Sequence, residues 1–336
     1  MAILYERTAV AKPTDWADLI SVIESESTPF TSMVSKRTKP AQVTHYWQAK
    51  QYPTVGHLGV LDGLDATEFN SNQAEELVGV AQKLWYNVGV SDFMEDAAHQ
   101  AGVSGSAIRS QTSEGLITLK RMIEKRCLSD AEAVRDDGVA QGNETRGVFK
   151  WTDNAFNIHA VPTNFQTPAD SKYAGTLIAF SEDEMGNLGE SAYKQKKGQV
   201  NLDGFCGIEL KRRFTEFTTY QAQSAGGATY TPVRSFNGQQ KDRELVSTID
   251  ALVLDSGRYR LHVSSFLKSN KTTGADSATT HKSGIFMDMS MCGLAYTRLP
   301  RVVNQEYQGG GHKRIIDTLF MLMVDNPLSL IAVNAT

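Results

Sequence analysis

The clearest hydrophobic pattern in the chain lies between residues 105 and 137. Apolar and small side chains recur there every three or four positions, from Ile108 to Val134. Such a stripe is typical of a helix with one buried face. A helix of about 29 residues spans roughly 43 Å, which is longer than most globular helices. The pattern therefore predicts one long helix, with Lys120 and Glu124 paired on its other side at i, i+4 spacing.

Two short helical segments precede this helix. Apolar residues from Trp16 to Ile23 follow helical spacing, and Pro29 occupies the favoured first position of a second turn, which carries Phe30. Both segments are too short to be stable alone in water. We therefore expect each of them to dock on another surface.

An apparent β-ribbon follows. Residues 43–52 are rich in β-prone side chains, and residues 77–91 alternate between apolar and polar positions. Strands of about 10 residues reach roughly 33 Å, and open strand edges favour pairing with another chain. The loop between them, residues 53–76, has no Lys or Arg. Its acidic residues are Asp62, Asp65, Glu68, Glu75 and Glu76. They lack EF-hand spacing, so a solvated loop is favoured over a divalent-cation site.

The second half of the chain alternates between helices and strands. Ser181, followed three residues later by Glu184, predicts the start of a helix. Residues 205–217 predict a short strand that runs into a helix. Strands are also expected at 245–254 and 258–267, which form a hairpin, and at 285–297, 313–324 and 328–333.

Length and composition narrow the class of protein. The chain has 336 residues, which suggests about two domains. Its 34 basic and 38 acidic residues argue against a dedicated nucleic-acid binder and leave room only for weak local contact. Three scattered cysteines without CxxC spacing indicate a reducing compartment rather than disulfides or a zinc site. No stretch is long enough to span a membrane and no signal peptide is evident, so we expect a soluble protein made in a cytoplasm.

No catalytic, cofactor or metal residue can be assigned. The seven histidines form no HExxH motif, and GxSxG and Walker A motifs are absent. Three glycines at 309–311 precede Lys313 and Arg314, as in some phosphate-binding loops. The segment leads into a predicted strand and lacks the GK[ST] ending, so a turn between strands is the favoured interpretation.

Several short motifs occur in a fixed order along the chain. TPF.SM at residues 28–33 is followed by T.H.W at 44–47, and the long helix carries L..LKRMIEKRCL at 116–128. Further motifs are LDGLDA at 61–66, NVGVSD at 87–92, GIELKRRFTEF at 207–217, RLPRVVNQE at 298–306 and DTLFMLMVDNP at 317–327. This ordered set resembles the major capsid proteins of tailed bacteriophages, which have the Hong Kong 97-type fold.

The resemblance implies an α+β fold in five parts. They are an N-terminal arm (1–42), an extended loop (43–92), a peripheral domain with a spine helix (93–181), an axial domain (182–284) and returning strands of the peripheral domain (285–336). The implied function is structural and not enzymatic. Hexamers and pentamers of the chain would form an icosahedral phage head, assembled in the bacterial cytoplasm, around double-stranded DNA.

The resemblance also implies how subunits contact their partners. The arm and the loop would clasp neighbouring subunits through Trp16, Phe30, Trp47, Asp62, Asp65 and Glu68. The other implied partners are a portal, possible decoration proteins and DNA held by weak non-specific contact, with no membrane and no cofactor. We also expect the acidic loop to attract the basic clusters at 194–197 and 211–213 of a neighbour, unless these clusters face the packaged DNA.

Two alternatives stay open at this point. An encapsulin-like shell has the same fold and encloses a protein cargo instead of a genome. An α/β enzyme would need a convergent cluster of polar residues, and the sequence indicates none.

Overall fold

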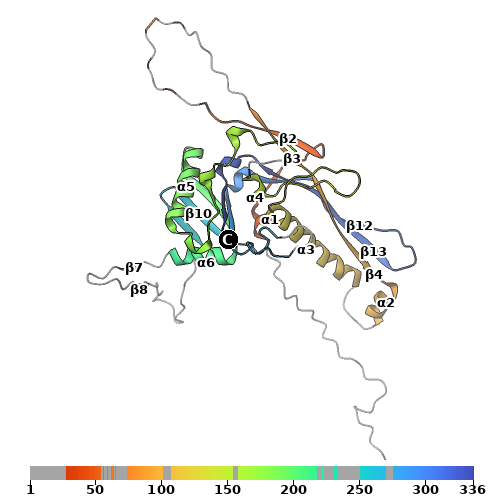
Figure 1. Cartoon of the computed structure of the whole chain (residues 1–336). Coiled ribbons are helices and arrows are strands. Elements are labelled where there is room, and N and C mark those ends of the chain that lie inside the picture. Colours follow the sequence, from red (N-terminus) through yellow and green to blue (C-terminus); the bar gives the residue numbers. More distant parts are fainter. Residues whose placement is uncertain are drawn as a thin grey trace, which may run out of the picture.

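The computed structural model describes most of the chain. The described ranges are 28–53, 74–100, 107–153, 158–217, 250–269 and 275–336, with shorter pieces at 56, 59, 62–63, 65, 221–222 and 231–232. The helix expected at residues 14–23 lies outside them. The fold mixes helices and strands, as predicted, and has two principal sheets (Figure 1).

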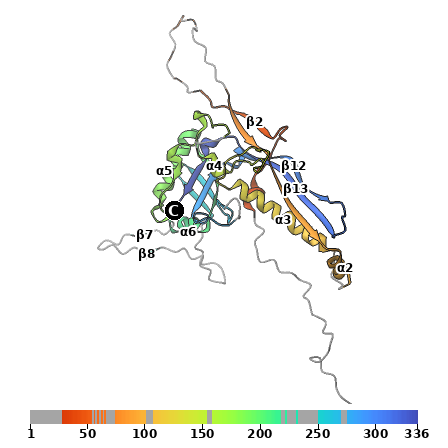
Figure 2. The ribbon, with the colours of Figure 1, turned by 45° about the vertical axis from the view of Figure 1, so that its right-hand side comes forward.

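A four-stranded sheet forms the elongated half of the subunit. Its strands are, in spatial order, β1 (Ser35–Arg37), β12 (Cys292–Asn304), β13 (His312–Val324) and β4 (Gln82–Val90). The long helix α3 (Ala107–Cys127) lies along one face of β4 and β13 (Figure 2). The shorter helix α2 (Asp92–Gln100) follows β4 at the far end of this sheet.

A six-stranded sheet forms the compact half. Its strands are, in spatial order, β5 (Lys172–Tyr173), β14 (Ile331–Asn334), β11 (Ser283–Met287), β6 (Val200–Cys206), β10 (Gly257–Val263) and β9 (Ala251–Leu254). Helices α5 (Glu182–Lys196) and α6 (Ile208–Phe217) pack against this half through buried apolar residues, among them Met185 and Phe214.

Short elements complete the described part of the chain. They are α1 (Pro29–Met33), β2 (Thr44–Ala49), β3 (Glu75–Val80), α4 (Val148–Trp151), β7 (Gln221–Ala222), β8 (Thr231–Pro232) and the 3-10 turns η2 (Thr163–Phe165), η3 (Ala169–Ser171), η4 (Leu177–Ala179), η5 (Met289–Met291) and η6 (Pro327–Ser329).

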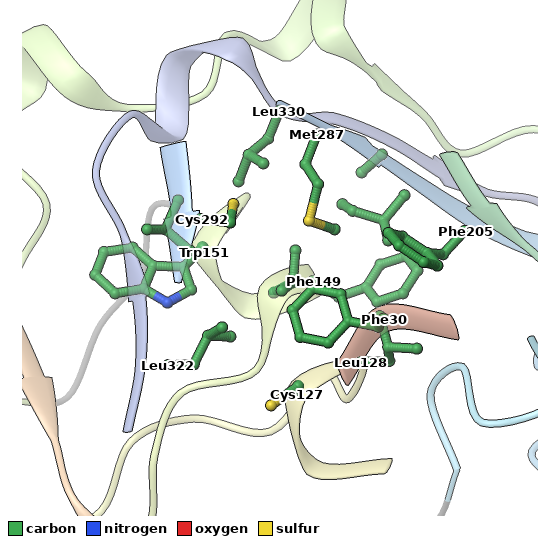
Figure 3. Close-up of a cluster of buried hydrophobic side chains, with 14 of the residues drawn as sticks. Phe30, Cys127, Leu128, Phe149, Trp151, Phe205, Met287, Cys292, Leu322 and Leu330 are labelled. Atoms are coloured by element: carbon green, nitrogen blue, oxygen red, sulfur yellow. The ribbon is translucent and has the colours of Figure 1, made fainter. Parts of the chain in front are cut away.

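One hydrophobic cluster joins the two halves. It contains Phe205 of the six-stranded sheet, Leu322 of the four-stranded sheet and Cys127 at the end of α3, all fully buried (Figure 3). Phe30 of α1 lies in the same cluster, with its ring 5.4 Å from that of Phe205 in an edge-on arrangement. Because both sheets contribute to this core, the two halves are packed as one body.

The long helix is shorter than predicted. It begins near the expected residue but is 21 residues long and ends at Cys127, instead of continuing to residue 137. The segment after it folds back along the helix end, where Arg126 Nε donates to the carbonyl of Thr145 at 2.8 Å. Gly147 then donates its N–H to the carbonyl of Ala131 at 3.0 Å. The second contact occupies the carbonyl of Ala131, which a helix extending to residue 137 would have used internally.

The ribbon is also shorter than predicted. Residues 77–91 form two strands that divide at Ala81, since β3 pairs with β2 whereas β4 pairs with β13. Apolar and polar residues alternate in both strands, but the two strands pair with different neighbours. Only six residues on each side form the ribbon itself.

The strands expected to return to the peripheral domain are shared between the sheets. Within 285–336, β12 and β13 join the four-stranded sheet, but β14 joins the six-stranded sheet, as does β11 at the start of this range. Every residue of β11 is buried, which fits a central strand covered on both faces.

Other local predictions are confirmed. Ser181 caps α5, and its Oγ accepts the backbone N–H of Glu184 at 3.3 Å. β6 runs directly into α6. β9 and β10 form the predicted hairpin, although residues 245–249 lie outside the described part. Gly257 has φ 151°, and a Cβ there would lie 1.8 Å from the carbonyl oxygen of Val200, so the turn requires glycine.

Candidate assembly surfaces

The ribbon of β2 and β3 packs on the body along its length, since Leu77 and Ala49 both lie in the hydrophobic cluster that joins the two halves. Trp47 of β2 lies with its ring centroid 5.8 Å from that of the buried Trp151. Ala81, directly after β3, donates its N–H to the carbonyl of Val43 at 2.7 Å. Beyond β2, every described residue from 50 to 74 is exposed. The ribbon is therefore packed on its own subunit, whereas the described residues of its connecting segment are exposed.

The start of the described chain is anchored by a buried carboxylate. Glu124 of α3 is fully buried, and its two oxygens accept the backbone N–H groups of Phe30 at 2.9 Å and Thr31 at 2.7 Å. The N-cap residue Thr28 makes no side-chain cap. Glu124 thus satisfies the free N–H groups at the start of α1. Lys120 instead donates to Ser32 Oγ at 3.4 Å, so the surface pair predicted for Lys120 and Glu124 is wrong.

The predicted contact residues occupy different environments. Phe30 is fully buried in its own subunit, which removes it from the set of residues able to touch a neighbour. Trp47 is partly buried at the base of the ribbon, while Asp62 and Asp65 are exposed in the loop. Trp16 and Glu68 lie outside the described residues.

Four cations of the basic clusters are paired within their own subunit. Lys194 lies 2.6 Å from Glu190, and Lys196 lies 2.9 Å from Asp288. Lys211 and Arg213 have equivalent partners in Asp250 and Glu216. These four cations already have a carboxylate partner, whereas Lys197 and Arg212 are exposed and form no ion pair with a described residue.

The described residues contain no arrangement typical of an enzyme site. No group of three His, Cys, Asp or Glu side chains among them is placed to hold a metal ion. All three cysteines are buried, and burial raises the pKa of both Cys206 and Cys292 to about 12, which leaves them as unreactive thiols at neutral pH. In the part of the chain that the structure covers, no helix is long and apolar enough to cross a membrane.

The glycine-rich segment before Lys313 is a turn between β12 and β13, as favoured by the sequence. Gly311 has φ 107°, and a Cβ there would lie 2.2 Å from the carbonyl oxygen of Val90. The glycine is thus explained by close packing against the end of β4. Lys313 and Arg314 belong to β13 and not to a phosphate-binding loop.

Comparison with known proteins decides the family. The family model described as SU10 major capsid protein matches residues 4–335. The chain belongs to this family. It is a structural component of a phage capsid, and its family is one of structural proteins and not of enzymes. No curated protein matches the chain.

Solved structures show the same fold at low sequence identity. The chain is similar to a protein in the capsid structure of the Cyanophage P-SCSP1u, with TM-score 0.59, 13% identity, and coverage of 96% of this chain and 93% of that one. It is similar to a protein of Mycobacterium phage Che8, with TM-score 0.56, 14% identity, and coverage of 96% and 97%. A third match is the capsid of a native GTA particle, with TM-score 0.59, 11% identity, and coverage of 97% and 96%. The capsid protein therefore has the Hong Kong 97-like fold that its motifs indicated.

Membership of a capsid protein family indicates which surfaces of the subunit are candidates for function. A capsid protein works by contact with further copies of itself, so its functional residues are those that remain exposed after the subunit core is formed. Sequence reasoning found the acidic loop. The sequence analysis missed the structural role of Glu124. The first turn of α1 after Pro29 contains no acidic residue, which indicated that the acceptor for its free N–H groups must come from another segment.

Proposed function

We propose that this capsid protein assembles as hexamers and pentamers into an icosahedral head that encloses double-stranded DNA. The observation that best supports the proposal is the ribbon of β2 and β3, whose base is packed while every described residue beyond β2 up to residue 74 is exposed. A segment whose described residues are exposed in its own subunit is suited to lie on a neighbour.

The proposed contacts between subunits involve two segments, the N-terminal arm and the extended loop. The arm before α1, with Trp16, and the extended loop, with Asp62, Asp65 and Glu68, clasp adjacent subunits, and Trp47 supports the loop from its base. The peripheral domain comprises the four-stranded sheet with α3, and the axial domain comprises the six-stranded sheet with α5 and α6. A portal, decoration proteins and weak non-specific contact with DNA are included as partners on the resemblance to tailed-phage capsids.

Electron microscopy of the purified protein tests this function. We expect shells of uniform size, with six-fold and five-fold capsomers in averaged images and with nuclease-protected DNA in particles from infected or packaging-competent cells. Shells that hold protein cargo and no DNA would favour the encapsulin-like alternative. A folded protein that stays monomeric over a range of concentration, salt and pH would contradict the proposal.

A further inference from the structure

Residues 129–147, between the end of α3 and α4, form a narrow folded segment that we call the tongue. Val134 and Glu144 pair across it, with N···O distances of 3.1 and 2.8 Å. At its tip, Asp137 Oδ1 accepts three backbone N–H groups of the turn that follows, each at 2.9 Å. Residues 135–142 are all exposed. The tongue is therefore attached to the subunit at its base.

Two buried arginines hold the base of the tongue. Arg126 of α3 donates from Nε to the carbonyl of Thr145 at 2.8 Å and from Nη2 to the carbonyl of Glu132 at 3.0 Å. Arg146, which is 3% exposed, donates from Nε to Glu132 Oε1 at 2.8 Å. Burying both charges of such a pair costs desolvation energy, which leaves little net gain in stability. That cost suggests a role in position rather than in stability.

The base of the tongue contacts the point at which the ribbon and the four-stranded sheet divide. β3 and β4 separate at Ala81, and the last pair between β4 and β13 joins Gln82 to Phe320. Thr145 donates its N–H to Gln82 Oε1 at 3.2 Å, and its Oγ1 accepts the N–H of Leu322 at 3.1 Å. The tongue thus binds the edge of β13 just beyond the end of β4.

Arg146 also supports the ribbon through two neighbouring indole rings. Its guanidinium carbon lies 4.6 Å from the centre of the Trp151 ring, within the range of a cation–π interaction. The Trp151 ring in turn lies 5.8 Å from that of Trp47 in β2. Trp151 is fully buried, and Figure 3 shows it beside the cluster that joins the two halves. A chain of contacts therefore runs from Glu132 through Arg146 and Trp151 to the ribbon.

We propose that the tongue is a clamp that fixes the direction of the ribbon, with Arg146 as a positioning residue that acts through Trp151. Leu77 and Ala49 hold the ribbon by apolar contact, which is non-directional. The hydrogen bonds and ion pair at the base of the tongue add contacts of defined geometry. The inference rests on the proposed function, because the direction of the ribbon decides where the extended loop can meet a neighbour. A ribbon fixed before assembly loses less conformational entropy on contact.

Spin-label distances in the unassembled subunit test the clamp. Labels are attached at the exposed positions Gln48→Cys in the ribbon and Asn187→Cys in α5, with Ser113→Cys in α3 and Asn187→Cys as the reference pair. The native cysteines are all buried. Glu132→Met combined with Arg146→Met removes both charges of the buried pair, so no unpaired charge is left inside. We expect the 48–187 distance distribution to broaden or shift, while the 113–187 distribution stays unchanged.

The matched control is Arg135→Met, at an exposed position of the same tongue, which should change neither distribution. Arg146→Lys keeps a cation beside the Trp151 ring and should retain the wild-type distributions. If the double variant is unfolded, Trp151→Phe takes its place, since it keeps the core apolar and weakens the contact with Trp47. An unchanged 48–187 distribution in a folded variant, or equal broadening in Arg135→Met, would overturn the inference.

Assembly should depend on the direction of the ribbon. If the double variant populates the wild-type direction for only about a tenth of the time, the concentration needed for assembly should rise by about tenfold. Normal assembly of a variant with a broadened 48–187 distribution would contradict this dependence. If the wild type forms no shells, the proposed function fails, whereas the distances in the unassembled subunit still decide whether the clamp exists.

Discussion

At the scale of single residues, one buried carboxylate explains how the N-terminal segment is held. Glu124 of α3 is fully buried, which is costly for a charged group unless it is hydrogen-bonded. Its partners are the two N–H groups of α1 at Phe30 and Thr31. One side chain therefore joins the start of the described chain to the long helix, about ninety residues further on.

Replacing Glu124 should destabilise the subunit. Glu124→Ala leaves two N–H groups of α1 without an acceptor, at a cost of about 1–3 kcal/mol for each buried group. We expect urea unfolding of the unassembled subunit to show a loss of about 2 kcal/mol or more. The control Glu114→Ala, at an exposed position of the same helix, should change stability by less than about 0.5 kcal/mol. Equal effects at both positions would show that the contact with α1 contributes nothing.

Stability should also depend on pH through Glu124. Burial raises the pKa of Glu124, and this effect outweighs the hydrogen bonds from Thr31 and Phe30, which lower it. Because the folded pKa lies above the unfolded one, the contribution of this group to stability is fully present below the unfolded pKa and is lost as pH rises through the folded pKa.

The measurement is the difference in unfolding free energy between wild type and Glu124→Gln across a pH series. We expect the wild type to lose stability relative to Glu124→Gln as pH rises from about 4.3, the usual pKa of a glutamate, toward neutrality. A difference that is constant with pH, or that moves the other way, would show that Glu124 does not titrate in this manner.

At the scale of elements, α3 is defined by what packs on it. Its buried positions include Gly115 and Glu124, which a hydrophobic stripe does not identify, while Leu116 of the predicted stripe is 40% exposed. The close approach at Gly115 lets β4 and β13 lie against the helix without an intervening side chain. The helix ends where Arg126 and the returning segment 129–147 meet.

Two glycines in helices should respond oppositely to alanine. Gly186→Ala in α5 should stabilise the subunit by about 0.5–1 kcal/mol, because no atom lies within 4 Å of the added Cβ and alanine is the better helix former. Gly115→Ala in α3 should destabilise it by about 1–3 kcal/mol, because the Cβ would lie 2.5 Å from Cδ1 of the buried Ile316. Thermal unfolding of the two variants is the measurement. Similar gains at both positions would contradict the observed packing of α3 on the sheet.

At the scale of the whole molecule, a single packed body supports exposed contact surfaces. The cluster around Phe30, Phe205 and Leu322 joins the two sheets, so the subunit core does not depend on a neighbour (Figure 3). The described residues of the loop beyond β2 are exposed and contribute nothing to that core. Such exposed surfaces can change without unfolding the subunit.

Deleting the loop tests this separation of roles. A variant in which residues 52–73 are replaced by a short glycine turn should keep the thermal stability of the unassembled subunit, since every described residue of this segment is exposed. It should fail to form stable shells in sedimentation and electron microscopy. If this variant is unfolded, the loop belongs to the subunit core. If it still forms normal shells, the loop lies outside the assembly contacts.

The sequence by itself determined the local elements and the order of parts. Helical spacing located α3, the Ser181 cap located α5, and the alternation in residues 77–91 reported strands correctly. These features depend on neighbours within a few residues, so a linear pattern is sufficient to predict them. The ordered motifs also led to the correct family, and the acidic loop stood out because its charge is uninterrupted along the chain.

Only the tertiary structure decided which neighbours each element has. Alternation cannot distinguish a strand paired in a ribbon from one paired in a sheet, and so the division at Ala81 was missed. The same holds for β14, which joins a different sheet from β13 although only a few residues separate them. The end of α3, the burial of Phe30 and the cap formed by Glu124 depend on contacts between residues far apart in the chain.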